Sequence, residues 1–151
     1  MKYAAEELTP SLYEEIVPLH KAHWDELKRS TSERMDFDYP RYYQLQEAGV
    51  WRLYTARSGT GELVGYVQAM AVPSLHTKDM EVYGELYYVK PEWRGRGRTV
   101  LRLFQFVERE LSHLGAKRLR FSYPVYAGGR YAEWFDMLGY APQEICVVKE
   151  M

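Results

Sequence analysis

The chain has 151 residues, of which 46% are hydrophobic and 27% charged, and its formal net charge is −1. No apolar run is long enough to span a membrane, the N-terminus does not resemble a signal peptide, and a single cysteine, Cys146, excludes an internal disulfide. We therefore expect a cytoplasmic protein that forms one globular domain over residues 1–151.

The first fifty residues predict a short strand at 2–7 followed by two helices. The first helix begins near residues 9–11, and Pro18 is expected to kink or split it. Its apolar stripe consists of Leu12, Ile16, Leu19, His23 and Leu27. The second helix is expected at 41–48, and Gly49 ends it.

Two histidines in the first helix, His20 and His23, are three residues apart. One interpretation is a metal pair, but the sequence offers no third ligand nearby, which favours packed or surface histidines.

The middle of the chain predicts an antiparallel meander with strands at 50–57, 63–72 and 81–89. Beyond residue 115 the pattern predicts a strand at 117–123, a helix at 131–138 that Gly139 ends, and a last strand at 145–149. The strand at 117–123 follows a long helix, so we expect it to be parallel to the strand at 81–89, with a right-handed crossover.

The stretch between these two strands, residues 90–115, is the most specific part of the sequence. Residues 94–98 alternate arginine with glycine, and apolar residues then fall at 100, 103, 104, 107, 111 and 114, which predicts an amphipathic helix ended by Gly115. Glycines that admit close backbone approach, a helix N-terminus and three arginines together indicate an anion site. The spacing matches neither the nucleotide P-loop nor the Rossmann glycine pattern.

The residues from Val89 to Thr99, Val-Lys-Pro-Glu-Trp-Arg-Gly-Arg-Gly-Arg-Thr, resemble motif A of the GCN5-related N-acetyltransferases, the GNAT superfamily. The family pattern is Gln/Arg-x-x-Gly-x-Gly/Ala. Arg94 and Gly97 occupy its first two defining positions, and Thr99 stands where glycine or alanine is usual.

The resemblance implies that this loop binds the pyrophosphate of acetyl-CoA and that the preceding strand end pairs its backbone with the pantetheine arm. The implied coenzyme-binding residues are Tyr87, Tyr88, Val89, Arg94, Gly95, Arg96, Gly97, Arg98, Thr99, Val100 and, at the start of the last helix, Arg130. The implied fold is a GNAT-type α/β (α+β) domain, with a mixed, mostly antiparallel central sheet flanked by helices in the order β-α-α-β-β-β-α-β-α-β. No metal is implied.

An amine attacks a thioester only when it is unprotonated, so an acylating site benefits from a base and from an acid for the leaving thiolate. Strand alternation predicts that Glu81, Tyr83, Glu85, Tyr87 and Val89 share one side. The family often uses an acidic residue of this strand as the base. We expect Glu85, and after it Glu81, in this role; the alternatives are solvated carboxylates and a proton relay through water alone.

The general acid is harder to assign from the resemblance. The family often places a tyrosine in the last helix, where this chain has Phe135. Tyr126 and Tyr131 are the nearby candidates, and the alternative is that both only pack.

Charge is unevenly distributed along the chain. Residues 1–50 hold ten acidic against six basic residues, and residues 90–120 hold nine basic against three acidic. The acidic half includes Glu33, Asp36 and Asp38, which we expect to attract a cationic acceptor, with Trp24 and Tyr39 as aromatic walls. The alternative is that these acidic residues form a solvated surface without a binding role.

These observations predict an acetyl-CoA-dependent N-acetyltransferase that acts on a primary amine of a small molecule, peptide or protein. Two alternatives stay open: an acyl-CoA-binding regulatory module without turnover, and a basic nucleic-acid-binding protein. No membrane partner is expected, and the sequence leaves a homodimer open.

Overall fold

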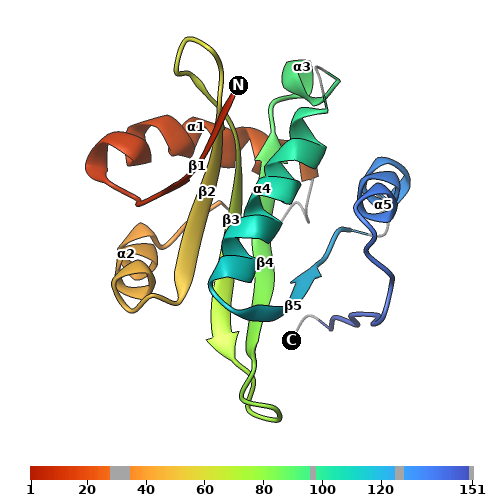
Figure 1. Cartoon of the computed structure of the whole chain (residues 1–151). Coiled ribbons are helices and arrows are strands. Elements are labelled where there is room, and N and C mark those ends of the chain that lie inside the picture. Colours follow the sequence, from red (N-terminus) through yellow and green to blue (C-terminus); the bar gives the residue numbers. More distant parts are fainter. Residues whose placement is uncertain (28–34, 96–97, 125–127, 150–151) are drawn as a thin grey trace.

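The computed structural model describes residues 1–27, 35–95, 98–124 and 128–149 (Figure 1). In chain order its elements are β1 (Lys2–Glu6), α1 (Pro10–Leu27), α2 (Tyr39–Glu47), β2 (Trp51–Arg57), β3 (Leu63–Pro73), β4 (Met80–Val89), α3 (Pro91–Arg94), α4 (Thr99–His113), β5 (Ala116–Phe121) and α5 (Gly128–Met137). None of these described helices is long and apolar enough to cross a membrane.

The strands form one sheet in the order β1-β2-β3-β4-β5. Neighbours from β1 to β4 are antiparallel, whereas β5 is parallel to β4 because α4 carries the chain back across the sheet. The predicted meander and the parallel strand after the long helix are therefore confirmed.

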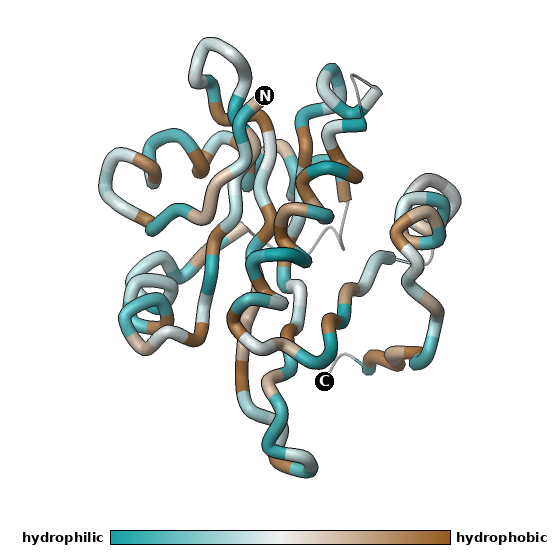
Figure 2. Tube along the Cα trace, in the orientation of Figure 1, coloured by the Kyte–Doolittle hydropathy of each residue, from teal (hydrophilic) through white to brown (hydrophobic). Residues whose placement is uncertain are grey.

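Helices cover both faces of this sheet, so the core has two halves. In Figure 1, α4 crosses the front of the sheet and α1 lies behind it. The half beneath α4 and α5 contains Val82, Tyr87 and Leu103, and the half beneath α1 and α2 contains Ile16 and Tyr66. Apolar positions, drawn brown in Figure 2, accordingly recur along the strands and along α4.

The amphipathic pattern of α4 is realised as predicted. Five residues of its predicted stripe are buried, namely Val100, Leu103, Phe104, Val107 and Leu111, whereas Leu114 follows the helix and is exposed. Gly115 follows the helix with φ of 83°, a left-handed conformation that glycine adopts without the steric cost of a Cβ.

The N-terminal helices differ from expectation in their details. Pro18 does not split α1, which runs as one element of 18 residues. Helix α2 begins two residues earlier than predicted because Asp38 caps it, accepting a 3.0 Å hydrogen bond from the Arg41 amide. The four-residue helix α3 was not predicted.

A β-bulge in β4 overturns the predicted alternation along this strand. Gln68 pairs with Leu86 and Ala69 pairs with Gly84, which leaves Glu85 as an extra residue. As a result Val82 and Tyr87, an odd number of positions apart, both pack beneath α4. The expectation that Glu85 shares a face with Tyr87 and Val89 was therefore wrong.

The predicted strand at 145–149 was also wrong, because residues 140–149 form no strand. Ile145, Val147 and Val148 are 90%, 88% and 85% exposed. Their β-branched side chains favour a pleated, half-buried surface, and the preference is realised only against a neighbouring strand. The described order of elements therefore ends with α5.

Candidate active site

The candidate active site lies where β4 and β5 separate. Their pairing ends at Gly84 and Phe121. Beyond it, the β4 segment Glu85–Val89 has no ladder partner on its β5 side among the described residues. Tyr87 spans the gap, since its hydroxyl donates a 2.8 Å hydrogen bond to the Ser122 carbonyl. An unpaired strand edge of this kind can pair with an extended ligand.

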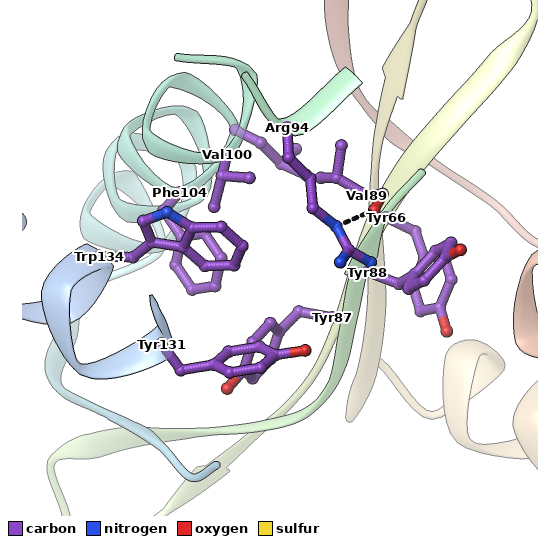
Figure 3. Close-up of a pocket in the computed structure, with 10 residues that line it drawn as sticks. Tyr66, Tyr87, Tyr88, Val89, Arg94, Val100, Phe104, Tyr131 and Trp134 are labelled. Atoms are coloured by element: carbon purple, nitrogen blue, oxygen red, sulfur yellow. Dashed lines mark hydrogen bonds between the residues drawn. The ribbon is translucent and has the colours of Figure 1, made fainter. Parts of the chain in front are cut away.

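A narrow slot opens between this strand segment and the helices α4 and α5 (Figure 3). Its lining residues are Tyr66, Tyr87, Tyr88, Val89, Arg94, Val100, Leu103, Phe104, Tyr131 and Trp134. In Figure 3, Tyr131 and Trp134 stand on one side and Arg94 on the other. The slot's volume is about 10 Å³, room for about one water. The slot in this structure is therefore narrower than an extended thioester arm.

Arg94 is already held by protein groups at the edge of this slot. Its Nε donates a 2.7 Å hydrogen bond to the Val89 carbonyl, and Nη1 donates one of 2.8 Å to Glu26 of α1. The guanidinium also lies 5.3 Å from the centre of the Tyr88 ring. The structure thus uses Arg94 to fix the end of β4 against α1.

The start of α4 has the geometry of an anion site. Arg98 precedes the helix with φ of 57° and ψ of 42°, a left-handed conformation, and Thr99 is buried at 1% exposure. Such a turn before a helix directs consecutive backbone amides toward one point. Arg96 and Gly97 lie outside the described residues, and the side chain of Arg130 is not described.

A second, larger cavity of about 230 Å³ lies on the α1 side of β4. Its lining residues are His20, His23, Trp24, Leu27, Phe37, Tyr42, Glu85 and Leu86. Residues 85 and 86 of β4 thus line this cavity, while residues 87 to 89 line the first. The two cavities thus lie along one short strand segment, residues 85 to 89.

Glu85 is the carboxyl group of the second cavity. Its side chain is accessible to solvent, yet partial burial by the surrounding protein raises its pKa. Hydrogen bonding from Trp51 and Tyr42 opposes this rise because it favours the carboxylate. A carboxyl with a raised pKa on a ligand cavity suits a general base.

The two histidines of α1 form part of the cavity wall. His20 Nδ1 lies 2.8 Å from the Tyr39 hydroxyl and its Nε2 lies 2.7 Å from the Gln68 amide nitrogen. Burial, with a contribution from His23, lowers the pKa of His20 to about 3, so it is neutral. His23 Nδ1 lies 3.0 Å from the Tyr66 hydroxyl. Within the described ranges, no group of three His, Cys, Asp or Glu residues is placed to hold a metal.

The other described residues predicted for catalysis lie outside the second cavity. Glu81 is at the opposite end of β4, where Arg118 and Arg120 lie 3.6 and 3.5 Å from its carboxylate. Tyr131 lines the slot, and Tyr126 lies outside the described residues. Phe135 is buried in an aromatic cluster with Tyr87 and Phe121.

Sequence reasoning missed several lining residues. Trp134 lines the slot one helical turn after Tyr131, a spacing that indicates a shared helix face. Phe37 and Tyr42 line the second cavity, and only the nearby acidic residues Asp36 and Asp38 pointed to this region. Tyr39, predicted as a wall, is instead the hydrogen-bond partner of His20.

A mixed sheet that separates beside a basic helix N-terminus is the arrangement that the resemblance of residues 89–99 to motif A implies. The model of the acetyltransferase (GNAT) family matches residues 12–133, and the chain belongs to this family. No curated protein sequence matches the chain.

Several solved structures share the fold at low sequence identity. A ribosomal-protein-alanine N-acetyltransferase from Brucella melitensis biovar Abortus 2308 aligns with a TM-score of 0.74 at 18% identity, over 100% of both chains. An aminoglycoside acetyltransferase from an uncultured soil metagenomic sample gives the same TM-score and identity, over 100% of this chain and 99% of that one. A glucosamine-6-phosphate N-acetyltransferase from Arabidopsis thaliana gives 0.69 at 14% identity, over 99% of both.

Proposed function

We propose that the protein transfers an acetyl group from acetyl-CoA to a primary amine by direct attack of the amine on the thioester. The observation that supports this most is the arrangement of two cavities on one strand segment. Residues 87 to 89 line a slot beside motif A, and residues 85 and 86 line a cavity with a carboxyl group. Donor and acceptor would approach the same segment from opposite faces of the sheet.

The coenzyme would lie along the unpaired edge of β4, with its pyrophosphate on the amides at the start of α4. Membership of the acetyltransferase family and the left-handed turn at Arg98 support this placement. Arg96 and Arg98 would add positive charge, while Arg94 would position the end of β4 through Val89 and Glu26.

In the reaction, the carboxylate of Glu85 would accept a proton from the amine, directly or through a water. The amine nitrogen then bonds to the carbonyl carbon, the carbon–sulfur bond breaks, and the thiolate takes up a proton. Tyr131 is our candidate donor of that proton because it lines the slot. The raised pKa of Glu85 supports its role, because a general base works best when its pKa lies closer to the pH at which it operates.

One observation favours a second candidate, acyl-CoA binding without turnover. Phe135 lacks a hydroxyl where the family often has its tyrosine, and it is 6% exposed within an aromatic cluster. Under this alternative the coenzyme binds, but no amine is acetylated.

Two measurements separate these functions. Coenzyme A should raise the thermal unfolding temperature, because a ligand of the folded state stabilises it. Release of free thiol from acetyl-CoA should then depend on an added amine.

The coenzyme site is tested by substitution. Gly97→Val should abolish coenzyme binding, because its side chain would occupy the phosphate path, whereas Gly59→Ala at an exposed turn should not. Binding without thiol release across amines would favour the second candidate, and no thermal shift would exclude both.

A further inference from the structure

The second cavity has a wall of aromatic rings contributed by Trp24, Phe37 and Tyr42. The Trp24 and Phe37 rings are 6.4 Å apart at 75°, and the Phe37 and Tyr42 rings are 6.5 Å apart at 33°. Rings arranged around a cavity attract a cation electrostatically, and they also accommodate an apolar body.

This cavity offers a single negative charge among its described lining residues, that of Glu85. Asp36 is exposed and does not line the cavity, and Asp38 is engaged as the cap of α2. The neutral state of His20 adds no opposing charge. One ammonium group can therefore be neutralised by the described lining residues, whereas a second would find no carboxylate among them.

The size of the cavity sets a further limit. Its volume of about 230 Å³ is below the roughly 300–1,000 Å³ of pockets that hold drug-sized ligands. The part of an acceptor enclosed by this cavity is therefore about the size of a single ring or a short branched chain.

We propose that the acceptor is a small primary amine with one positive charge on an apolar body, held by the rings of Trp24, Phe37 and Tyr42 with its ammonium group at Glu85. This inference rests on the proposed acetyl transfer and narrows its acceptor class. It disfavours polyamines and aminoglycosides, because their additional ammonium groups meet no counter-charge in the described wall.

The first test compares acceptors in the wild-type protein with saturating acetyl-CoA. We expect 2-phenylethylamine to have a kcat/KM at least about tenfold higher than spermidine or kanamycin, from the uncompensated charge of the polycations. A higher kcat/KM for either polycation overturns the inference.

The second test removes one aromatic ring. Phe37→Leu should raise the KM for 2-phenylethylamine by about 3- to 30-fold, the range expected for loss of a cation–ring contact, and leave the KM for acetyl-CoA unchanged. Phe106→Leu is the matched control, since Phe106 is also partly buried but belongs to α4 and packs against the core on the other face of the sheet. Trp24→Leu repeats the test should Phe37→Leu fail to fold. An unchanged amine KM in the folded variants overturns the inference.

A binding measurement separates failure of this inference from failure of the proposed function. Calorimetric titration without acetyl-CoA should show tighter binding of 2-phenylethylamine than of 2-phenylethanol, which has the same ring but no charge. If the amine binds in this way but no thiol is released with acetyl-CoA, the transferase proposal fails and the cation site stands. If thiol is released with spermidine and the two phenyl compounds bind equally, the transferase proposal stands and the cation site fails.

Discussion

Arg94 of α3 and Glu26 of α1 join the two sides of the candidate active site, with a 2.8 Å hydrogen bond from Nη1 to the Glu26 carboxylate. The same guanidinium holds the Val89 carbonyl at 2.7 Å. Glu26 lies between Trp24 and Leu27 in the sequence, the helix segment that lines the second cavity. One ion pair therefore connects the strand end beside the slot to the wall of the other cavity.

This pair should contribute to stability through direct coupling. In a double-mutant cycle with Arg94→Gln and Glu26→Gln, we expect a coupling free energy of about 1–2 kcal/mol, because the two side chains contact each other and share a network. Their exposures are 12% and 32%. Urea unfolding of the four proteins measures it.

The control cycle uses Lys21 and Asp25, an ion pair whose side chains are 70% and 65% exposed. Its coupling should be below about 0.5 kcal/mol, since solvent screens exposed pairs. Equal couplings in the two cycles would contradict the structural role given to Arg94.

Glu85→Gln should lower kcat for amine acetylation by about 100-fold or more, the usual contribution of a general base, without changing the KM for acetyl-CoA. In the wild type, kcat/KM should fall as the pH drops through the raised pKa of Glu85, because the carboxyl must be ionised to accept a proton. That acid limb should be absent from the variant. Glu81→Gln is the control, and loss of the limb in that protein instead would transfer the role to Glu81.

His20 should make the protein less stable in acid. Its pKa is about 3 in the folded state against an ordinary value of 6.5, so between these values the unfolded chain binds a proton that the folded chain does not. The free energy of unfolding should thus fall by about 1.4 kcal/mol per pH unit as the pH drops through this window.

Urea unfolding at two pH values checks this effect. Between about pH 7 and pH 5, the wild type should lose roughly 2 kcal/mol more than His20→Gln does. His76→Gln, in which an exposed histidine of the β3–β4 connection is changed, should follow the wild type. The same pH dependence in His20→Gln would show that the destabilisation comes from other groups.

Gly84→Ala should destabilise the protein by about 1–3 kcal/mol, the cost of overpacking a well-packed site. A Cβ at Gly84 would lie 2.0 Å from Cδ1 of Phe121, where β4 and β5 last pair. The second change Phe121→Leu should restore part of the loss, while Gly59→Ala, with no atom within 4 Å of the added Cβ, should be neutral. Thermal unfolding of these proteins is the measurement, and a neutral Gly84→Ala would show that the strands separate readily here.

Much of the fold could be predicted from local patterns. The stripe of α4, the glycine at 115 and the meander strands depend on side-chain spacing and backbone conformation, which the sequence displays directly. The strand at 145–149 could not be excluded in this way, because strand formation depends on a neighbouring edge. The bulge in β4 could not be predicted either, because nothing in the sequence of residues 81–89 distinguishes a regular strand from a strand with one extra residue.

The candidate site, too, was predictable only in part. The anion site is contiguous in the sequence and was predicted from its glycines, arginines and helix start. The ring wall instead brings Trp24, Phe37 and Tyr42 together with Glu85 from other parts of the chain. Asp38 was expected to face a ligand, but its local hydrogen bond to Arg41 places it at a helix start. Contacts between distant segments, which no spacing rule reports, form the ring wall, whereas a local contact decides the position of Asp38.

The bulge in β4 also determines what the deletion of one residue from this strand would do. In a regular strand, loss of one residue turns every following side chain to the other face. Here loss of Glu85 would remove the extra residue itself, and Gly84 and Leu86 would follow each other opposite Ala69 and Gln68. Such a shortened chain would retain a continuous ladder and its core contacts while lacking the proposed base. Folding alone would not select against that deletion, so only a need for the carboxyl group would preserve the residue.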